Sequence, residues 1–180
     1  MTSLSGIIRE DMTFGSGDAV SLSGNVQIAS GYTVTFGPGS SLTGNGQGTS
    51  KQIEVFGSLV ISGTSTNLIE VEDIKIYGKE GGSTSINYSH VFNSVPNSSA
   101  TRIYPTFNNS GSLNISNSVI EIYGTKIDLN STSVIKGNIF NNTQIDANQK
   151  NTITLDSNTF IGTSTIVTLS DHGFWSTPLL

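Results

Sequence analysis

The last third of the chain repeats itself at a fixed interval of 20 residues, and this repeat constrains the fold more than any other feature of the sequence. Aligned in steps of 20, three consecutive units place chemically similar residues in the same columns. The columns are Ile115, Ile135 and Leu155; Ile120, Phe140 and Phe160; Ser118, Asn138 and Asn158; and Ile127, Ala147 and Val167. A weaker copy precedes them at Val95, Ser98, Ala100 and Phe107. A fixed period of this kind is typical of solenoids, in which each repeat stacks on the previous one.

Each unit contains two or three short strands. Ile120 with Ile122, and Ile127 with Leu129, alternate with polar residues, and Gly, Asn, Ser and Thr separate the pairs. An antiparallel sandwich would also contain short strands, but it gives no reason for similar residues to recur every 20 positions. Coils stacked about 4.8 Å apart do give one, because an inward position lies above the same position of the previous coil. The repeat therefore predicts a single-domain parallel β-helix.

The composition favours strands throughout the chain. Hydrophobic residues, mostly Val, Ile, Leu and Phe, make up 34% of the 180 residues, which is enough for a core, whereas charged residues make up only 12%. Helices are disfavoured because β-branched residues lose side-chain freedom in them, and because Ser, Asn and Gly favour turns. We therefore expect an all-β chain.

The polar column predicts an internal ladder. Ser118, Asn138 and Asn158 recur among the apolar columns, so their side chains should stack at one bend inside the solenoid. Stacked amides can bond to one another and to the backbone, as they do in cross-β assemblies. Asn also tolerates the left-handed conformation that a bend requires. We expect these three residues to stabilise a bend.

The stretch at residues 31–39 resembles a turn-and-strand signature of the pectate-lyase-like superfold, whose members are right-handed parallel β-helices. The signature reads G-x-T-V/L-T-x-x-P-G, and the matching residues are Gly31, Thr33, Val34, Thr35, Pro38 and Gly39. The Asn-bearing pieces at 137–140 and 157–160 resemble bends of the same proteins. The resemblance implies a right-handed helix of about seven coils over roughly residues 20–170, about 35 Å tall, with terminal caps. It implies an architecture and not an activity.

We divide the chain into three parts. Residues 1–18 form an N-terminal cap or attachment arm, residues 19–170 form the β-helix, and residues 171–180 form a C-terminal tail. Terminal coils need cover, because they expose unpaired backbone and apolar interior. The tail either folds over the last coil or contacts a partner chain through its large apolar residues. These are Phe174, Trp175, Leu179 and Leu180.

Residues 81–111 interrupt the regular pattern and contain Pro96 and Pro105, so we expect loop-bearing coils there. Exposed loops on a rigid scaffold often carry recognition. Four side chains in this segment could stack on sugars or bond to them and are the candidate contacts for a host-surface glycan. They are Tyr88, His90, Arg102 and Tyr104. The alternative is that these loops have no binding role.

Charge and composition argue against several classes of partner. The formal net charge is −5, from 13 acidic and 8 basic residues, and no basic cluster exists, so a nucleic-acid partner has no electrostatic support. The chain has no cysteine, which excludes disulfides and thiolate metal ligands. No apolar run approaches the roughly 20 residues that span a bilayer, so we expect no membrane partner. The N-terminus does not have the pattern of a secretory signal, if Met1 is the native start.

The carboxylates do not form an evident catalytic constellation. The densest group is Glu70, Glu72 and Asp73; the first two should share one face of a strand, where they could share a proton or a cation. Their alternation with apolar residues favours the solvated face of an ordinary strand. Polysaccharide hydrolysis needs two carboxylates a few ångströms apart in one groove. Three further carboxylates do not fall into one column of the repeat. They are Asp128, Asp146 and Asp156.

Two further patterns bear on function. His90 and His172 are far apart in the sequence and neither has an evident partner, so we predict no catalytic residue, no metal site and no cofactor. The threonine pairs in TVT and TIT raise ice binding as an alternative, because flat threonine arrays can order water. These pairs do not repeat in one column of the 20-residue alignment.

These observations predict a non-enzymatic structural or binding protein on the exterior of a bacteriophage particle, as a spike, fibre or capsid decoration. A rigid, low-charge, cysteine-free stack with no signal and no catalytic group suits that role. The resemblance implies a homotrimer that contacts other virion proteins. The alternative is a secreted bacterial β-helix, outside the cell or on its surface, acting as an adhesin or as a polysaccharide lyase or hydrolase.

Overall fold

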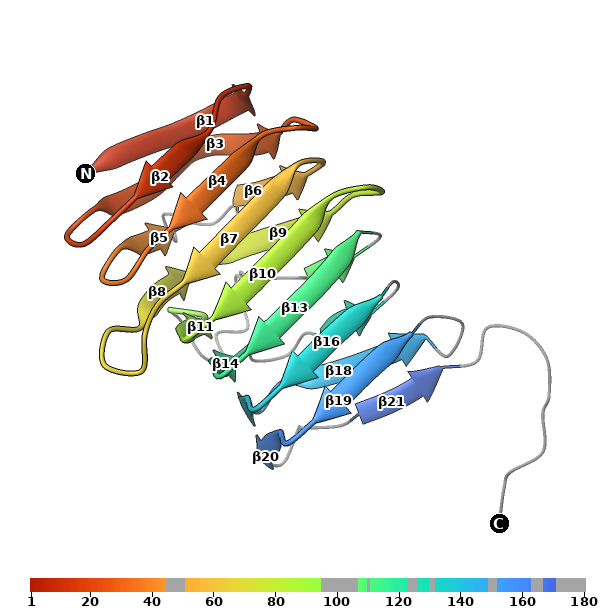
Figure 1. Ribbon diagram of the computed structural model, residues 1–180. Coiled ribbons are helices and arrows are strands. Elements are labelled where there is room, and N and C mark those ends of the chain that lie inside the picture. The colour runs from red at the N-terminus through yellow and green to blue at the C-terminus, as the bar shows by residue number, and fades with distance from the viewer. Residues whose placement is uncertain are drawn as a thin grey trace, which may run out of the picture.

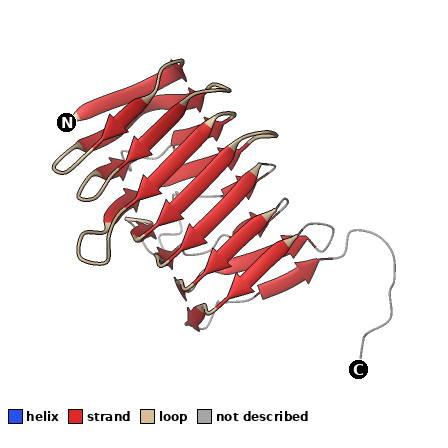
Figure 2. Cartoon of the chain, viewed as in Figure 1, coloured by secondary structure: helices blue, strands red, loops and turns tan. Residues whose placement is uncertain are grey.

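The computed structural model describes residues 1–44, 51–94, 107–109, 111–122, 126–129, 132–148, 152–162 and 167–170. In these residues the regular structure is all strand, as Figure 2 shows, and none of them lies in a helix that could cross a membrane. The strands pair in parallel and wind into a β-solenoid of about six turns. The predicted all-β parallel β-helix is therefore confirmed, with slightly fewer turns than expected.

Three parallel sheets form the sides of the solenoid. We call the seven-stranded sheet, which is the front row of arrows in Figure 1, sheet 1. Its strands, in stacking order, are β2 (Met12–Phe14), β4 (Thr33–Phe36), β7 (Ser58–Ser62), β10 (Ser83–Asn87), β13 (Ser112–Ser116), β16 (Ser133–Lys136) and β19 (Ile153–Asp156).

Sheets 2 and 3 are the two arms of a fourteen-stranded sheet, and they meet at the long strand β3 (Ala19–Ile28). Sheet 2 begins with the first part of β3 and continues with β5 (Ser41–Thr43), β8 (Ile69–Glu72), β11 (Ser89–Phe92), β14 (Val119–Glu121), β17 (Ile139–Asn141) and β20 (Thr159–Ile161). Sheet 3 begins with the last part of β3 and continues with β6 (Lys51–Val55), β9 (Ile74–Gly78), β12 (Phe107–Asn109), β15 (Lys126–Leu129), β18 (Gln144–Asn148) and β21 (Val167–Ser170).

Single residues with positive φ turn the chain from one sheet into the next. Between sheets 1 and 2 these include Tyr88 at 47°, Asn117 at 51° and Ser157 at 55°. Between sheets 2 and 3 they include Asp73 at 54° and Asn142 at 50°. Asn and Asp enter this left-handed region more readily than most residues. Bends of one or two residues let the next strand start at once and keep the coil short.

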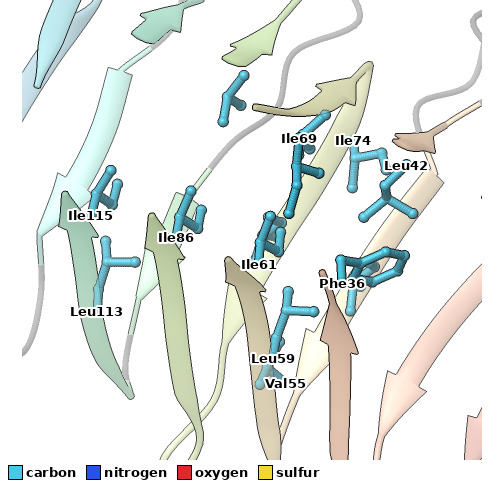
Figure 3. Packing of buried hydrophobic residues seen from close by; sticks show 14 of the residues in the cluster. Phe36, Leu42, Val55, Leu59, Ile61, Ile69, Ile74, Ile86, Leu113 and Ile115 are labelled. Carbon is cyan, nitrogen blue, oxygen red and sulfur yellow. The ribbon is translucent and has the colours of Figure 1, made fainter. Parts of the chain in front are cut away.

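Alternate residues of all three sheets point into one hydrophobic core. Figure 3 shows the inward side chains of successive strands following one another along the stack, with Ile61, Ile86 and Ile115 on neighbouring strands of sheet 1. The rings of Phe14 and Phe36 stack in the same column, with centroids 5.0 Å apart. Burying a side chain of this size contributes about 1.5–3 kcal/mol. The core is therefore a set of columns, as the repeat predicted.

Two of the predicted apolar columns are confirmed by the strand register. Ile115, Ile135 and Leu155 are partners in sheet 1, and Ile120, Phe140 and Phe160 are partners in sheet 2. The predicted column of Ile127, Ala147 and Val167 is wrong. Ile127 pairs with Ile145, and Ile145 pairs with Val167, so the two steps differ in length. The bends that flank sheet 3 vary in length, and a constant interval does not apply there.

The weaker copy proposed before residue 111 is wrong in sheets 1 and 2. The register partners of Ile115 and Ile120 are Ile86 and Val91, whereas Val95, Ser98 and Ala100 lie outside the described residues. Its last member is placed as predicted: Asn108 pairs with Asp128, and this register puts Phe107 beside Ile127 in sheet 3.

The segment 81–111 is described at residues 81–94, 107–109 and 111. β10 and β11 keep a regular register with the strands on both sides of them. Residues 95–106 and 110 lie outside the described residues. The part of the segment up to β11 is regular, and the loop-bearing coils expected in this segment stay a prediction.

Residues 1–18 continue the stack. β1 (Thr2–Ile8) pairs in parallel with both parts of β3, and β2 pairs with β4 in sheet 1. Leu4, Ile8 and Phe14 are only 7–8% exposed and join the core, whereas Ile7 is 51% exposed on the outer side of β1. This segment therefore forms the first layer of the solenoid. Whether it also attaches the protein to a partner stays a prediction.

Candidate functional site

The predicted polar ladder lies at the bend between sheets 1 and 2. The Asn138 amide oxygen accepts a hydrogen bond of 2.9 Å from the Ser118 backbone N–H, and its Nδ2 donates to the Ile115 carbonyl at 2.8 Å. The Asn158 amide oxygen accepts from the Asn138 backbone N–H at 3.0 Å. The Ser118 hydroxyl accepts from the backbone N–H of Ser89 at 3.1 Å, so the ladder includes one member that the 20-residue alignment missed. The ladder satisfies backbone groups of successive bends, and its role is structural.

A compact group of polar and aromatic side chains lies on the outer face of sheet 2. In the register, His90 lies beside Glu70, and Phe92 lies beside both Glu72 and Glu121. We define the His90 patch as six side chains on this face. They are Glu70, Glu72, His90, Phe92, Glu121 and Asn141. Four consecutive strands of sheet 2, namely β8, β11, β14 and β17, thus present the patch on a rigid surface.

Direct contacts order the centre of the His90 patch. The rings of His90 and Phe92 are stacked, with centroids 4.5 Å apart. His90 Nε2 lies 3.4 Å from one carboxylate oxygen of Glu121, and Asn141 Nδ2 donates a 2.9 Å hydrogen bond to the other. The sequence indicated no partner for His90. The structure supplies two: Phe92 on the same strand, and Glu121 on β14, which is the neighbouring strand of sheet 2.

The carboxylates of the patch are crowded. Burial raises the pKa of the Glu72 carboxyl, the charges of Asp73 and Glu70 raise it further, and a hydrogen bond with Thr43 acts against them. Asp73 itself is not part of the surface, although the sequence grouped it with Glu70 and Glu72. Asp73 is 1% exposed at its bend, and its carboxylate accepts hydrogen bonds from both the backbone N–H and the hydroxyl of Ser94. It fastens one coil to the next.

The remaining predicted contact residues are only partly described. Tyr88 forms the bend that leads into β11 and is half-buried. Of the candidate glycan contacts, Tyr88 and His90 are therefore placed, and both lie at the start of β11. Arg102 and Tyr104 lie outside the described residues. The four apolar residues of the C-terminal tail lie outside them as well. They are Phe174, Trp175, Leu179 and Leu180.

The aspartates that the sequence left isolated include one pair. The three do not share one column, as expected, but Asp128 and Asp146 are register partners on β15 and β18 of sheet 3. An alignment in steps of 20 separates them, because the coil between them is shorter than that. Asp156 lies on sheet 1, where it pairs with Lys136 at 3.1 Å. Neighbouring parallel strands lie about 4.8 Å apart, which places Asp128 and Asp146 side by side on the outer face.

The threonines on sheet 1 also share a column, contrary to the sequence alignment. Thr13, Thr35 and Thr154 belong to one register column on its outer face. The intervening members are Val60, Ser85, Asn114 and Val134. An ice-ordering surface needs an unbroken threonine array, and this column does not provide one. Ice binding therefore gains no support from the corrected register.

In the described part of the chain, no three His, Cys, Asp or Glu side chains are grouped so that they could hold a metal ion. The fold and the surface groups define the protein as a parallel β-solenoid with a polar, partly aromatic patch on one side. Neither protein-family models nor curated proteins nor solved structures give a match to this chain.

Proposed function

We propose that this chain is a non-enzymatic structural and binding module on the exterior of a bacteriophage particle, acting as a spike, fibre or capsid decoration. In this proposal the helix is right-handed, as the resemblance to the pectate-lyase-like superfold implies, and three chains associate and contact other virion proteins. The observation that carries the proposal is the parallel register of sheets 1 and 2, which runs without interruption over the described strands.

The parallel register supports a mechanical role for a physical reason. Backbone hydrogen bonds run along the stack from coil to coil, so bending the column or opening it requires many of them to break together. Aliphatic and aromatic columns fill the core of the described coils. The carboxylate of Asp73 is buried at a bend. Such a body resists proteolysis, since little of its backbone is locally unpaired. It is suited to hold a binding surface at a fixed distance from its attachment point.

The first test of this proposal is the assembly state. Light scattering of the native protein should give three times the mass of one chain, and an unheated sample in SDS should keep that mass. The intact chain should also occur in purified particles, and truncation after Asp171 should abolish its incorporation. A monomer that is absent from particles would contradict the proposal.

A second candidate function is supported by the Asp128–Asp146 pair. Retaining glycosidases place two carboxyl groups about 5–5.5 Å apart, close to the spacing of neighbouring strands. A secreted bacterial β-helix that cleaves a polysaccharide, or an adhesin of the same architecture, could use this face of sheet 3. The test is release of reducing ends from pectin, alginate and capsular polysaccharide. Activity lost in Asp128→Asn and Asp146→Asn, but kept in Asp156→Asn, would favour the enzyme over the structural module.

A further inference from the structure

The aromatic pair of the His90 patch is held at the centre of a rigid sheet. β11 is paired on one side with β8 and on the other with β14, so its backbone hydrogen-bonding groups are already used within the sheet. The side chains of His90 and Glu121 are 32% and 29% exposed, which means that they are partly packed yet still reachable from solvent. A ligand would therefore meet a preorganised surface and would not need to order it.

The type of surface argues against a peptide as the ligand. Extended peptides bind by adding a strand to a free sheet edge, and helical peptides bind in apolar grooves. β11 has no free edge, and a cavity of about 470 Å³ in the described residues lies elsewhere, along β1, with Leu4, Ile8 and Met12 in its lining. The patch instead combines aromatic rings with planar hydrogen-bonding groups.

This combination suits a sugar ring. The C–H face of a pyranose is apolar and can pack on an aromatic ring, whose buried area contributes much of the binding energy at such surfaces. Its hydroxyl groups need acceptors and donors in fixed positions around the ring. The carboxylates of Glu70, Glu72 and Glu121 are acceptors, and the Asn141 amide is a donor that is already oriented by Glu121.

The charge of the patch selects among sugars. Glu121 contacts His90, Glu70 is the register neighbour of His90 on β8, and Glu72 lies beside Phe92, so three carboxylates share one face with a single imidazole. Two lysines of the neighbouring coils lie on sheet 3 or just after it: Lys75 is on β9, and Lys79 follows β9 and pairs with Glu54 at 3.0 Å. A uronic or sialic acid would add a further negative charge next to the carboxylates of the patch, at an electrostatic cost.

We propose that the His90 patch is a binding subsite for an uncharged glycan chain, with His90 and Phe92 packing against a sugar ring and Glu121 and Asn141 bonding its hydroxyls. The inference rests on the proposed role of the protein as a binding module, and it names the chemical class of the ligand. It excludes acidic polysaccharides as ligands of this face.

The test is to titrate the full chain with a panel of oligosaccharides and to measure binding by calorimetry or ligand-observed NMR. The neutral members are cellohexaose, mannohexaose and N-acetylchitohexaose, and the acidic member is hexagalacturonate. At least one neutral member should bind, and hexagalacturonate should not. Phe92→Ala should weaken binding about tenfold or more, consistent with the loss of an aromatic contact. Glu121→Gln, which preserves the shape of the side chain, should weaken it to a smaller extent.

A matched control comes from another face. Tyr77 on β9 is a half-buried aromatic residue that faces outward from sheet 3, with Lys79 Nζ 5.6 Å from its ring, and Tyr77→Ala should leave binding unchanged. Phe92→Leu keeps apolar volume without a ring, and it separates loss of the ring from loss of folding. Unchanged melting temperatures in the variants would establish that they are folded.

Three results would overturn the inference: no binding of any neutral member, preference for hexagalacturonate, or loss of binding in Tyr77→Ala but not in Phe92→Ala. Failure here is distinguishable from failure of the proposed function. A trimer that incorporates into particles but binds no neutral glycan contradicts only the inference. A monomer that is absent from particles but binds through Phe92 contradicts only the structural role.

Discussion

One bend in each half of the solenoid, at Gly57 and at Asn138, shows a different chemistry. In the N-terminal half, glycine allows one coil to approach the next: a Cβ atom on Gly57 would lie 2.3 Å from the carbonyl oxygen of Tyr32 and 2.4 Å from that of Ala29. In the C-terminal half, side-chain amides and hydroxyls hold the bends, with Asn138 bonding to the coils on both sides. The bend at Gly57 thus depends on close backbone contact and the bend at Asn138 on side-chain hydrogen bonds, although Asp73 also holds a bend of the N-terminal half through its side chain.

Only one of the two halves shows a repeat. The core column of sheet 1 is unevenly spaced in the sequence at first and becomes evenly spaced only from Ile115 onward. Its members in stacking order are Phe14, Phe36, Ile61, Ile86, Ile115, Ile135 and Leu155. The ladder residues Ser118, Asn138 and Asn158 lie in coils of one length, whereas the step from Ser89 to Ser118 is longer. A glycine bend requires only a missing side chain, and it tolerates coils of several lengths.

The regularity of the sequence repeat does not predict how deeply the core residues are buried. Ile135 and Phe140 are fully buried, whereas their register partners in the next coil, Leu155 and Phe160, are 38% and 40% exposed in the described structure. The less regular N-terminal half holds Phe36 at 0% exposure. Leu155 and Phe160 lie on β19 and β20, the last strands of sheets 1 and 2, so no further described strand covers them.

The largest loss of stability should come from truncating a fully buried core side chain in the N-terminal half. Phe36→Ala should lower the free energy of unfolding by about 3–5 kcal/mol, because it leaves a cavity between fully packed coils. Phe160→Ala should cost about 1–2 kcal/mol, because its ring is already partly in water. Urea unfolding followed by circular dichroism measures both. Equal losses at the two sites would contradict the difference in burial.

Removing one residue of the polar ladder should lower the free energy of unfolding nearly as much. Asn138→Ala removes the partner of the Ser118 N–H and of the Ile115 carbonyl, and it should cost about 3 kcal/mol, since each buried group left unsatisfied costs about 1–3 kcal/mol. Asn114→Ala, on the exposed outer face of β13, should change stability by less than about 0.5 kcal/mol. The same urea titration distinguishes them. If Asn138→Ala left the free energy of unfolding unchanged, water would be replacing the hydrogen bonds of the ladder.

Filling a glycine bend should have a smaller but clear effect. Gly57→Ala forces the carbonyls of Tyr32 and Ala29 to move and should cost about 1–3 kcal/mol, the usual range for overpacking. Gly15→Ala is the control, because a Cβ atom there would meet nothing within 4 Å and the φ of Gly15 is not positive. Thermal unfolding should show a lower midpoint for the first variant only. If both behave alike, close approach is not what the glycine provides.

The smallest effects should be electrostatic and opposite in sign in the two halves. Because the folded state raises the pKa of Glu72, the ionised carboxylate destabilises the fold above the usual value of 4.5, and this effect vanishes as the pH falls below 4.5. Glu72→Gln should therefore raise the melting temperature at pH 7 and not at pH 4. A melting temperature that falls at pH 7 would show that Glu72 makes a favourable contact instead.

Asp156 in the C-terminal half provides the opposite case. Hydrogen bonds with Ser157 and Lys136, and the Lys136 charge, lower the pKa of its carboxyl below the usual value of 3.8. The ionised form is thus favoured in the folded state, and this contribution is lost as the pH falls through the lowered pKa. Asp156→Asn should slightly lower the melting temperature at pH 7 and have no effect near pH 2. A rise at pH 7 would contradict the ion pair.

The candidate surface sites were harder to predict from the sequence than the core. His90 meets Glu121, and Asp128 meets Asp146, but neither pair falls on the interval of the repeat. The sequence did place Glu70 and Glu72 on one face of a strand, yet it did not place an aromatic pair beside them. Outward positions show no period of their own, because they need not match the coil above.

The sequence by itself determined the kind of fold: an all-β stack with two apolar columns and a polar ladder. It could do so because inward side chains must match from coil to coil, and that requirement leaves a period wherever the coils have one length. Only the tertiary structure decided which residues face one another where coil length changes, including the long step from Ile86 to Ile115. Strand register depends on how many residues each bend absorbs, and bend length is settled by packing and backbone pairing across coils, not by local preference.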